Sequence, residues 1–294
     1  MNEGGRAAAT GTSITLVVVT RDRWAQLSAL LPRIRAGSPG NPLIVIDNAG
    51  AAPVPTPLAA APDVRVLRSD RDLGPAARNL GVRCAQTEFV AFCDDDAWWQ
   101  PGALAIAAGR LSRSPELGGV VGRVLVEPRA RLDPVSAAHE RDGTVVGFLA
   151  TALVVRREAF LSVGGYHERL GFGGEEDLLA MRFLSAGHDL VYEPDAVLHH
   201  RPAARTGPMK LGRERTVVRN ALWTAWLRRP WRVAAIQTMR ALRSRAGNCA
   251  VVPAVAGARW VLAEREVNPP EVEERLRRAS AATPPARRAR LSPS

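Results

Sequence analysis

Short runs of aliphatic residues, rich in valine and isoleucine, recur along the first third of the chain. The runs cover residues 14–19, 43–46, 64–67 and 89–93. Runs this short and this apolar are typical of strands that are buried on both faces of a sheet. Residues 24–36 and 74–84 lie between them and have the pattern of helices. This alternation predicts an α/β fold, with a mostly parallel sheet flanked by helices.

Polar residues follow each of these runs, and most of them are aspartates. In parallel sheets, ligands bind in the crevice beyond the carboxyl ends of the strands. One polar end would mean little, because loops are generally polar, but four in succession predict a binding site at one rim of the sheet. The four ends are Thr20-Arg21-Asp22, Asp47-Asn48, Asp70-Arg71-Asp72 and Asp94-Asp95-Asp96.

The acidic triplet Asp94-Asp95-Asp96 comes directly after the last of these strands. Three adjacent carboxylates repel one another unless a cation is present. Oxygen ligands of this kind suit Mg²⁺ or Mn²⁺, either of which can also bind a diphosphate. A solvated acidic turn is the alternative for the triplet taken alone. The other polar strand ends favour the metal.

The rest of the chain predicts a larger domain with a helical appendage. Helices are expected at 102–112, 156–163 and 173–186, and strand pieces at 120–121, 124–126, 148–155, 190–192 and 196–198. Basic amphipathic helices follow. We therefore expect a catalytic domain over 14–205, a C-terminal helical extension over 206–267, and disorder in the Gly/Ala-rich residues 1–13 and the Pro/Ala/Arg-rich residues 268–294.

The positive charge is concentrated near the C-terminus. The net charge is +11, and the residues from Arg201 onward carry +14, which leaves −3 for the first 200. A basic segment on a near-neutral body indicates an anionic partner for that segment. Nucleic-acid binding is one hypothesis from charge alone, but no nucleic-acid-binding motif is recognisable, and no nucleic acid is expected.

One stretch of this basic region has an apolar face. In residues 217–229, apolar side chains share a helical face flanked by arginines, and Trp223 and Trp231 are suited to a membrane interface. This pattern predicts either contact with an anionic membrane surface or packing on the catalytic domain.

The expected setting is cytoplasmic and reducing. Three scattered cysteines do not form a disulfide framework or a zinc motif. The N-terminal residues lack the apolar core of a signal peptide, and no apolar run approaches the roughly 20 residues of a membrane span. The sequence therefore predicts a soluble protein, or one peripheral to the inner face of the membrane.

Six short motifs occur in a fixed order along the chain. They are Val17-Val18-Val19-Thr20-Arg21-Asp22-Arg23, Val45-Ile46-Asp47-Asn48, Leu73-Gly74-Pro75-Ala76-Ala77-Arg78-Asn79, Phe92-Cys93-Asp94-Asp95-Asp96, Gly164-Gly165-Tyr166 and Gly173-Gly174-Glu175-Glu176-Asp177. In this order they resemble family 2 glycosyltransferases over roughly residues 14–200. The resemblance implies the Rossmann-like GT-A fold, a nucleoside-diphosphate sugar as donor, Mn²⁺ or Mg²⁺ as cofactor, and inverting transfer, of the hexosyltransferase class, to an acceptor hydroxyl.

The same resemblance implies roles for single residues in donor and metal binding. Thr20, Arg21 and Asp47 would contact the base and ribose of the donor, and the segment with Asp72, Gly74 and Arg78 would lie near the ribose and diphosphate. Asp94 and Asp95 would also face the donor. Asp94 and Asp96 would bind the metal together with a histidine of His199-His200. Neighbouring strand residues point to opposite faces, so only one histidine is expected to reach the metal, and His200 is favoured.

The catalytic base is expected in Glu175-Glu176-Asp177. The family usually has Glu-Asp or Asp-Asp here, so the extra glutamate leaves open which carboxylate is the base. A helix N-terminus favours an ionised carboxylate, as a base requires, although acidic first turns also occur simply to offset the helix dipole. Trp98 and Trp99 are candidates for a sugar or acceptor wall, with packing on the sheet as the alternative.

Two further hypotheses concern the whole domain. A catalytically inactive GT-A domain that only binds sugar nucleotides is the main alternative. A sugar-1-phosphate nucleotidyltransferase would have a Gly-rich, Lys-bearing start, which this sequence lacks. The sequence identifies no particular sugar, nucleotide or acceptor.

Overall fold

Four parallel strands form the first half of the sheet, as the apolar runs predict. The computed structural model describes residues 14–143, 145–202 and 208–282, so the expected disordered segment 1–13 and the last part, 283–294, of the expected disordered tail lie outside it. The parallel strands lie in the order β3-β2-β1-β4. Their bounds are β1 Ile14–Thr20, β2 Leu43–Asn48, β3 Val64–Ser69 and β4 Phe89–Asp94.

The second half of the sheet is mixed in direction and continues as β8-β6-β9-β5. β8 is antiparallel to both β4 and β6, β9 is parallel to β6, and β5 is antiparallel to β9. The expected strand over 148–155 begins only at Leu153, because residues 150–152 form a 3₁₀ turn. The bounds are β5 Ala97–Trp99, β6 Leu117–Val126, β7 Arg131–Leu132 (paired with β6), β8 Leu153–Arg156 and β9 Asp189–His200.

Helices cover both faces of the sheet, as expected. Side chains of β1 alternate between the two faces: Leu16 and Val18 pack with α1 and α4, whereas Val17 and Val19 pack with α3, α6 and α7. The bounds are α1 Trp24–Gly37, α2 Thr56–Ala59, α3 Ala77–Cys84, α4 Ala103–Arg113, α5 Pro134–Asp142, α6 Arg157–Ser162 and α7 Glu175–Ser185.

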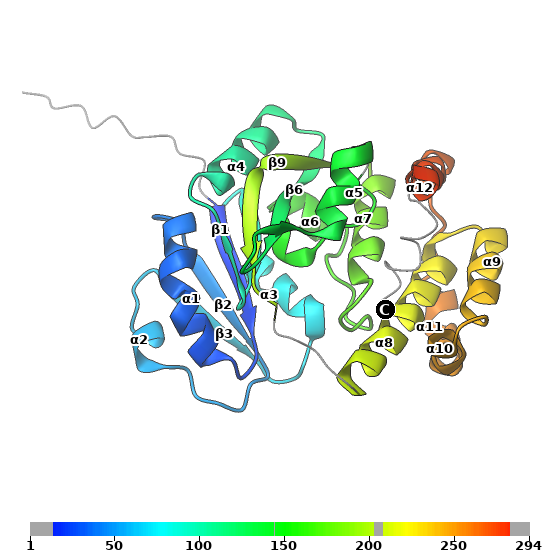
Figure 1. Ribbon diagram of the computed structural model, residues 1–294, viewed down its shortest axis with the longest axis horizontal. Helices are drawn as coiled ribbons and strands as arrows, with labels where there is room; N and C mark the ends of the chain where they lie inside the picture. The colour runs from blue at the N-terminus through cyan, green and yellow to red at the C-terminus, as the bar shows by residue number, and fades with distance from the viewer. Residues whose placement is uncertain (1–13, 144, 203–207, 283–294) are drawn as a thin grey trace, which may run out of the picture.

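The C-terminal extension consists of helices that pack against the domain next to α7 (Figure 1). α8 (Pro208–Arg228) contributes Leu222, Trp223 and Leu227 to a cluster that also holds Leu170 and Leu178 of the domain. The apolar face predicted within 217–229 is therefore largely buried, and packing on the domain accounts for it. The remaining helices of this layer are α9 Trp231–Ala241, α10 Arg245–Ala256 and α11 Ala258–Ala263.

One expectation is wrong: part of the predicted disordered tail is helical. α12 spans Pro270–Ala282, with Glu271 and Glu273 in its first turn. Val272 and Leu276, one helical turn apart, are buried against Met181 and Leu184 of α7. Two apolar anchors on one helical face are enough to dock this otherwise charged segment.

Two expectations from composition can also be compared with the described residues. No helix in these ranges is long and apolar enough to cross a membrane. Cys93 is fully buried in the sheet, as expected for a small apolar residue, and the three cysteines are unpaired.

The docking of α12 predicts a stability effect. Replacing Leu276 with alanine should lower the free energy of unfolding by about 2–4 kcal/mol, since it leaves a cavity against α7. Urea denaturation measures this. Arg277→Ala, which alters an exposed residue of the same helix, should change stability by less than about 0.5 kcal/mol. Equal effects of the two substitutions would mean that α12 does not pack as described.

Candidate active site

The acidic triplet lies at the end of β4, and its first member is paired with a buried arginine. Arg78 of α3 is almost fully buried and makes an ion pair and hydrogen bond with Asp94. The backbone N–H of Asp94 donates to Thr151 Oγ1 at 3.1 Å. Two nitrogens of Arg78, Nε and Nη1, are buried without a hydrogen-bond partner. The guanidinium therefore retains hydrogen-bonding capacity next to the carboxylates.

The other two carboxylates are held by side chains from the loop after β1 and from β9. The hydroxyl of Thr20 donates to Asp95 at 2.7 Å, and Arg23 contacts Asp95 at 2.7 Å and Asp96 at 3.3 Å. His200 Nε2 lies 3.3 Å from Asp96 Oδ1.

These contacts move the pKa values of the two carboxyls in opposite directions. Burial raises the pKa of Asp95 to about 6, although Thr20 and Arg23 oppose the rise. Burial also disfavours the charged form of Asp96, but His200 and Arg23 outweigh it and lower the pKa of Asp96.

The two histidines of β9 point to different surroundings, as strand alternation predicts. His200 faces the carboxylates, whereas His199 hydrogen-bonds Glu127 at 2.7 Å and stacks on Trp98 with ring centroids 5.2 Å apart. Trp99 is buried and donates its indole N–H to the carbonyl of Phe92. The structure thus packs both tryptophans, and it offers no support for a sugar wall at Trp98 or Trp99.

The candidate donor residues tie the loops at the rim to one another. Asp47 is fully buried, accepts from the N–H of Gly50 at 2.9 Å and pairs with Arg68 at 2.9 Å. Asp72 accepts from Asn48 and from the N–H of Gly74, both at 2.9 Å.

Arg21 reaches the same loop from β1. It pairs with Asp72, and both side chains are about half exposed. The donor roles of Thr20, Arg21, Asp47, Asp72 and Gly74 stay predictions.

The candidate base residues begin α7 and have different surroundings. Glu175 is buried, and its carboxyl accepts from the N–H of Gly173. Burial, and after it the charge of Glu176, raises the pKa of Glu175 to about 9.

Glu176 is more accessible than Glu175. It is half-buried, and burial raises its pKa as well, while Arg78 and a backbone hydrogen bond from Ala150 oppose the rise. Asp177 is exposed on the next position of the helix.

The 3₁₀ turn Ala150–Ala152 places the glutamates near the acidic triplet. Its Thr151 binds the backbone of Asp94, and its Ala150 binds the carboxyl of Glu176. Arg78 pairs with Asp94 and lies close enough to Glu176 to oppose the rise of its pKa. Glu176, Arg78 and Asp94 therefore belong to one site.

The C-terminal extension holds the glycine loop that precedes the glutamates. Asn220 of α8 is fully buried, and its amide donates to the carbonyls of Gly171 and Gly173, each at 2.8 Å. Gly173 has φ +109°, and a side chain there would lie 2.4 Å from Val217 of the same helix. The loop therefore needs glycine both for its backbone conformation and for the close approach of α8.

Three residues of the site were not predicted from the sequence. Thr151 and Asn220 lie outside every recognised motif, and both act through backbone groups far away in the chain. Arg23 belongs to a quoted motif, but its pairing with the carboxylates depends on the first turn of α1.

A preformed metal cage is not present among the described residues: no three His, Cys, Asp or Glu side chains are grouped to hold an ion. Asp96 and His200 are nevertheless adjacent, and Asp94 lies at the same strand end. Mg²⁺ in nucleotide sites is usually held by one or two carboxylates plus substrate phosphates and water. The oxygen and imidazole donors present are chemically suited to such an incomplete site, which a diphosphate would complete.

The raised pKa of Glu175 predicts how stability depends on pH. The ordinary value is 4.5 and the folded value is about 9, so the folded state binds more protons between these limits. Stability should therefore fall as pH rises through this interval, by up to about 1.4 kcal/mol per pH unit for one group. Glu175→Gln should make the fall shallower in urea titrations at pH 5 to 9.

A matched control for this titration is Glu116→Gln, which alters an exposed carboxylate. It should keep the wild-type slope. If Glu175→Gln also keeps that slope, Glu175 is not held protonated in the folded protein.

Comparison with known sequences places the first half of the chain in a family. Residues 15–159 match the model of Glycosyl transferase family 2. The pre-mycofactocin glycosyltransferase of Mycobacterium tuberculosis strain H37Rv is 32% identical over 204 residues, which cover 64% of this chain but 42% of that protein. An uncharacterized glycosyltransferase of Bacillus subtilis, YwdF, is 34% identical over 93 residues, or 30% of this chain and 34% of that protein.

Solved structures with the same fold share little sequence with this chain. GalNAc-T7 with UDP, GalNAc and Mn²⁺ has a TM-score of 0.60 at 14% identity, covering 76% of this chain and 50% of that one. The mannosyltransferase PcManGT from Pyrobaculum calidifontis, with GDP-Man and Mn²⁺, has a TM-score of 0.57 at 19% identity, covering 95% and 78%. The chain carries a family 2 glycosyltransferase domain with the GT-A fold.

Proposed function

We propose that this protein is a metal-dependent inverting glycosyltransferase, which moves a sugar from a nucleoside-diphosphate sugar to an acceptor hydroxyl. The observation that carries the proposal is the grouping of Asp94, Arg78 and Glu176 at one rim of the sheet. This rim is where parallel sheets bind their ligands. Inversion follows from the family resemblance, and hexosyl transfer is the expected subclass.

The metal proposed for this rim is Mn²⁺ or Mg²⁺, held by Asp96 and His200 with Asp94. Two structural neighbours are complexes with Mn²⁺ and a nucleotide or nucleotide sugar, which supports this cofactor. A divalent ion there would stabilise charge on the departing nucleoside diphosphate. Arg23 contacts both Asp95 and Asp96 and favours the charged form of each, although burial still raises the pKa of Asp95.

Glu176 is proposed as the general base. It is half-buried, so an acceptor hydroxyl can reach it, whereas Glu175 is buried and its carboxyl is engaged by the loop. Burial raises the pKa of Glu176, while Glu175, Arg78 and Ala150 favour its charged form, the form in which a base accepts a proton. Asn220 positions the loop before it and so acts through Glu175 and Glu176.

The alternative is a domain that binds sugar nucleotides without transferring the sugar. It shares the acidic rim but requires no base. Turnover therefore separates the two: a binding module would release no nucleoside diphosphate from any donor, with or without an acceptor.

Substitutions of the acidic residues test the proposed mechanism. Asp96→Asn should abolish Mn²⁺-stimulated release of nucleoside diphosphate from the preferred donor. Glu176→Gln should lower kcat by a factor of about 10² to 10⁴ while leaving donor affinity nearly unchanged, since a base acts in the chemical step. Glu175→Gln should retain turnover within about tenfold, because glutamine resembles the protonated carboxyl.

The control for these three substitutions is Asp63→Asn, which removes a surface ion pair with Arg35 away from the rim. Its kinetics should match the wild type. A larger loss in Glu175→Gln than in Glu176→Gln would assign the base to Glu175. Equal activity in EDTA and in Mn²⁺ would remove the metal from the mechanism.

We also propose that the C-terminal extension contacts an anionic membrane surface, now through α9–α11 rather than through the buried face of α8. Large apolar side chains are exposed on these helices, and arginines are exposed among them on α9. Apolar burial combined with cationic side chains is the basis of interfacial binding. The apolar residues are Trp231, Ile236, Met239, Val252, Val255 and Leu262, and the arginines are Arg232 and Arg240; Leu242 and Arg243, directly after α9, are also exposed.

Flotation with anionic vesicles tests this contact. The full chain should float at low salt and be released as salt rises, because the charge term is screened. Replacing both Ile236 and Met239 with serine should markedly reduce flotation, whereas serine at Ile106, an exposed apolar residue of α4, should not. Absence of flotation by the wild-type protein at low salt would contradict the membrane contact.

A further inference from the structure

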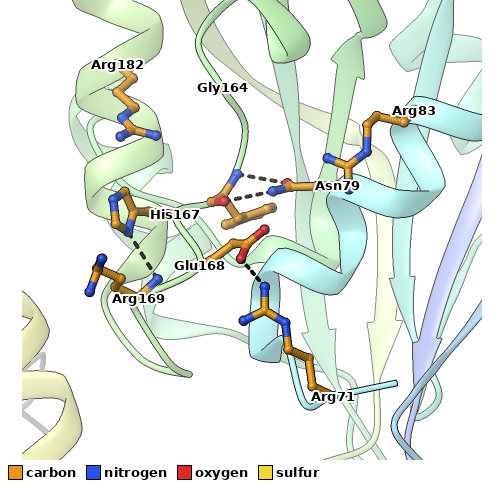
Figure 2. Close-up of a pocket in the computed structure, with 9 residues that line it drawn as sticks. Arg71, Asn79, Arg83, Gly164, His167, Glu168, Arg169 and Arg182 are labelled. Carbon is orange, nitrogen blue, oxygen red and sulfur yellow. Dashed lines mark hydrogen bonds and ion pairs between the residues drawn. The ribbon is translucent and has the colours of Figure 1, made fainter. Parts of the chain in front are cut away.

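A basic cavity lies outside the acidic rim, between α3, α7 and the loop after α6. It encloses about 630 Å³, within the range of small-ligand sites. Its lining includes Arg71, Arg83, Arg169 and Arg182, and one carboxylate, Glu168. Figure 2 shows these side chains gathered around the cavity, with Arg182 and Arg83 extending from helices on opposite sides.

The cavity is separate from the proposed catalytic rim. Asn79 forms part of its wall and donates to the carbonyl of Tyr166 at 2.8 Å, while its own oxygen accepts from the N–H of Tyr166 at 3.0 Å. The guanidinium of the preceding residue, Arg78, lies over the Tyr166 ring and is directed to Asp94 instead. Neighbouring residues of α3 thus serve two different sites.

The positive charge in this cavity is only partly neutralised. Arg71 pairs with Glu168 at 2.6 Å, with both side chains largely exposed. Among the described residues, Arg83 and Arg182 make no ion pair with a carboxylate, and Arg182 donates a long hydrogen bond of 3.4 Å to the carbonyl of Gly165. Burial, and after it the nearby Arg228, lowers the pKa of Arg182, although the charges of Glu264 and Glu266 oppose the fall. An anion in the cavity would further favour the charged form of Arg182.

We propose that this cavity binds a phosphate or diphosphate group through its arginines, Arg83 and Arg182 among them. Arginine forks match phosphate oxygens in geometry and charge, and the cavity has arginines on both of its walls. The inference does not depend on the proposed transferase activity. It concerns a second anion site on the same domain.

The phosphate can be free or carried by a lipid, and the surface around the cavity is compatible with both sources. A second cavity, of about 460 Å³, shares Arg169 with the basic cavity. Its lining includes Ala256 of α10 and Trp260 and Ala263 of α11. Trp260 also stacks on His167, the histidine of the basic cavity, with centroids 5.0 Å apart. An apolar chain attached to the phosphate would have this second cavity beside it.

Calorimetric titration of the full chain with inorganic pyrophosphate tests the site. EDTA is included so that the metal-dependent rim makes no contribution. The wild type should bind, and Arg83→Gln and Arg182→Gln should each weaken binding by at least about tenfold, as expected for loss of a charge-assisted contact. Glu168→Gln should tighten binding, because it removes the one carboxylate of the cavity.

The matched control is Arg65→Gln, which removes an exposed arginine of β3 outside the cavity. Its affinity should equal that of the wild type. Arg83 is exposed, so its variant should fold even if Arg182→Gln does not. Lack of pyrophosphate binding by the wild type, or equal weakening by Arg65→Gln and Arg83→Gln, would overturn the proposal.

Vesicles containing a phosphomonoester lipid distinguish the two sources. If the phosphate is lipid-borne, Arg83→Gln should reduce vesicle binding and pyrophosphate should compete with it. If the ligand is free phosphate, vesicle binding should be unchanged by Arg83→Gln while the calorimetric result stands. Both outcomes support an anion site, and they assign its ligand.

Discussion

The buried guanidinium of Arg78 is the interaction on which the rest of the site depends. Five carboxyls from two distant segments converge here: Asp94, Asp95 and Asp96 on β4 and the loop after it, and Glu175 and Glu176 on α7. Such a concentration of negative charge is unfavourable without cations. Arg78 pairs with Asp94 and also opposes the rise that burial causes in the pKa of Glu176, so one side chain stabilises both halves of the rim. Removing one partner of a buried pair of this kind typically costs about 3–5 kcal/mol.

The C-terminal helices are structurally part of this site. Asn220 of α8 fixes the glycine loop before Glu175, and the side chains of Leu222 and Trp223 pack α8 against the domain. A segment that composition marks only as basic and amphipathic therefore supports the candidate catalytic helix. Its large exposed apolar residues lie outside α8, so support of the site and the proposed contact with a membrane surface would depend on different side chains.

The parts of the fold predicted from sequence are those with a strong local pattern. The strands β1, β2 and β4 are largely apolar runs that end on polar residues, and the helices α1 and α7 have clear apolar faces, so each could be predicted. The direction of β8 and the strand β5 could not, because pairing between distant segments decides them. α12 has too few apolar residues to stand out from its charged surroundings, and its folding depends on the α7 surface.

The residues of the site could likewise be predicted only where a strong local pattern places them. The carboxylates and His200 follow strand ends, where period-two alternation indicates the direction of each side chain. Roles that depend on tertiary partners could not be predicted: the engagement of Glu175 by Gly173, the stacking of Trp98 on His199, and the contacts of Thr151 and Asn220. These residues have ordinary sequence surroundings and act only through the folded arrangement.

Thermal denaturation with nucleoside diphosphates is the most direct test of the acidic rim as a metal-dependent donor site. UDP, GDP and dTDP, each with Mn²⁺ or with EDTA, would be compared in the wild type and in Asp96→Asn. A true ligand stabilises by mass action, by about 2.7 kcal/mol at 100 times its Kd. We predict that one nucleotide raises the Tm of the wild type with Mn²⁺, and that EDTA or Asp96→Asn removes the rise. No stabilisation by any of the three with Mn²⁺, or the same stabilisation in EDTA, would contradict the account.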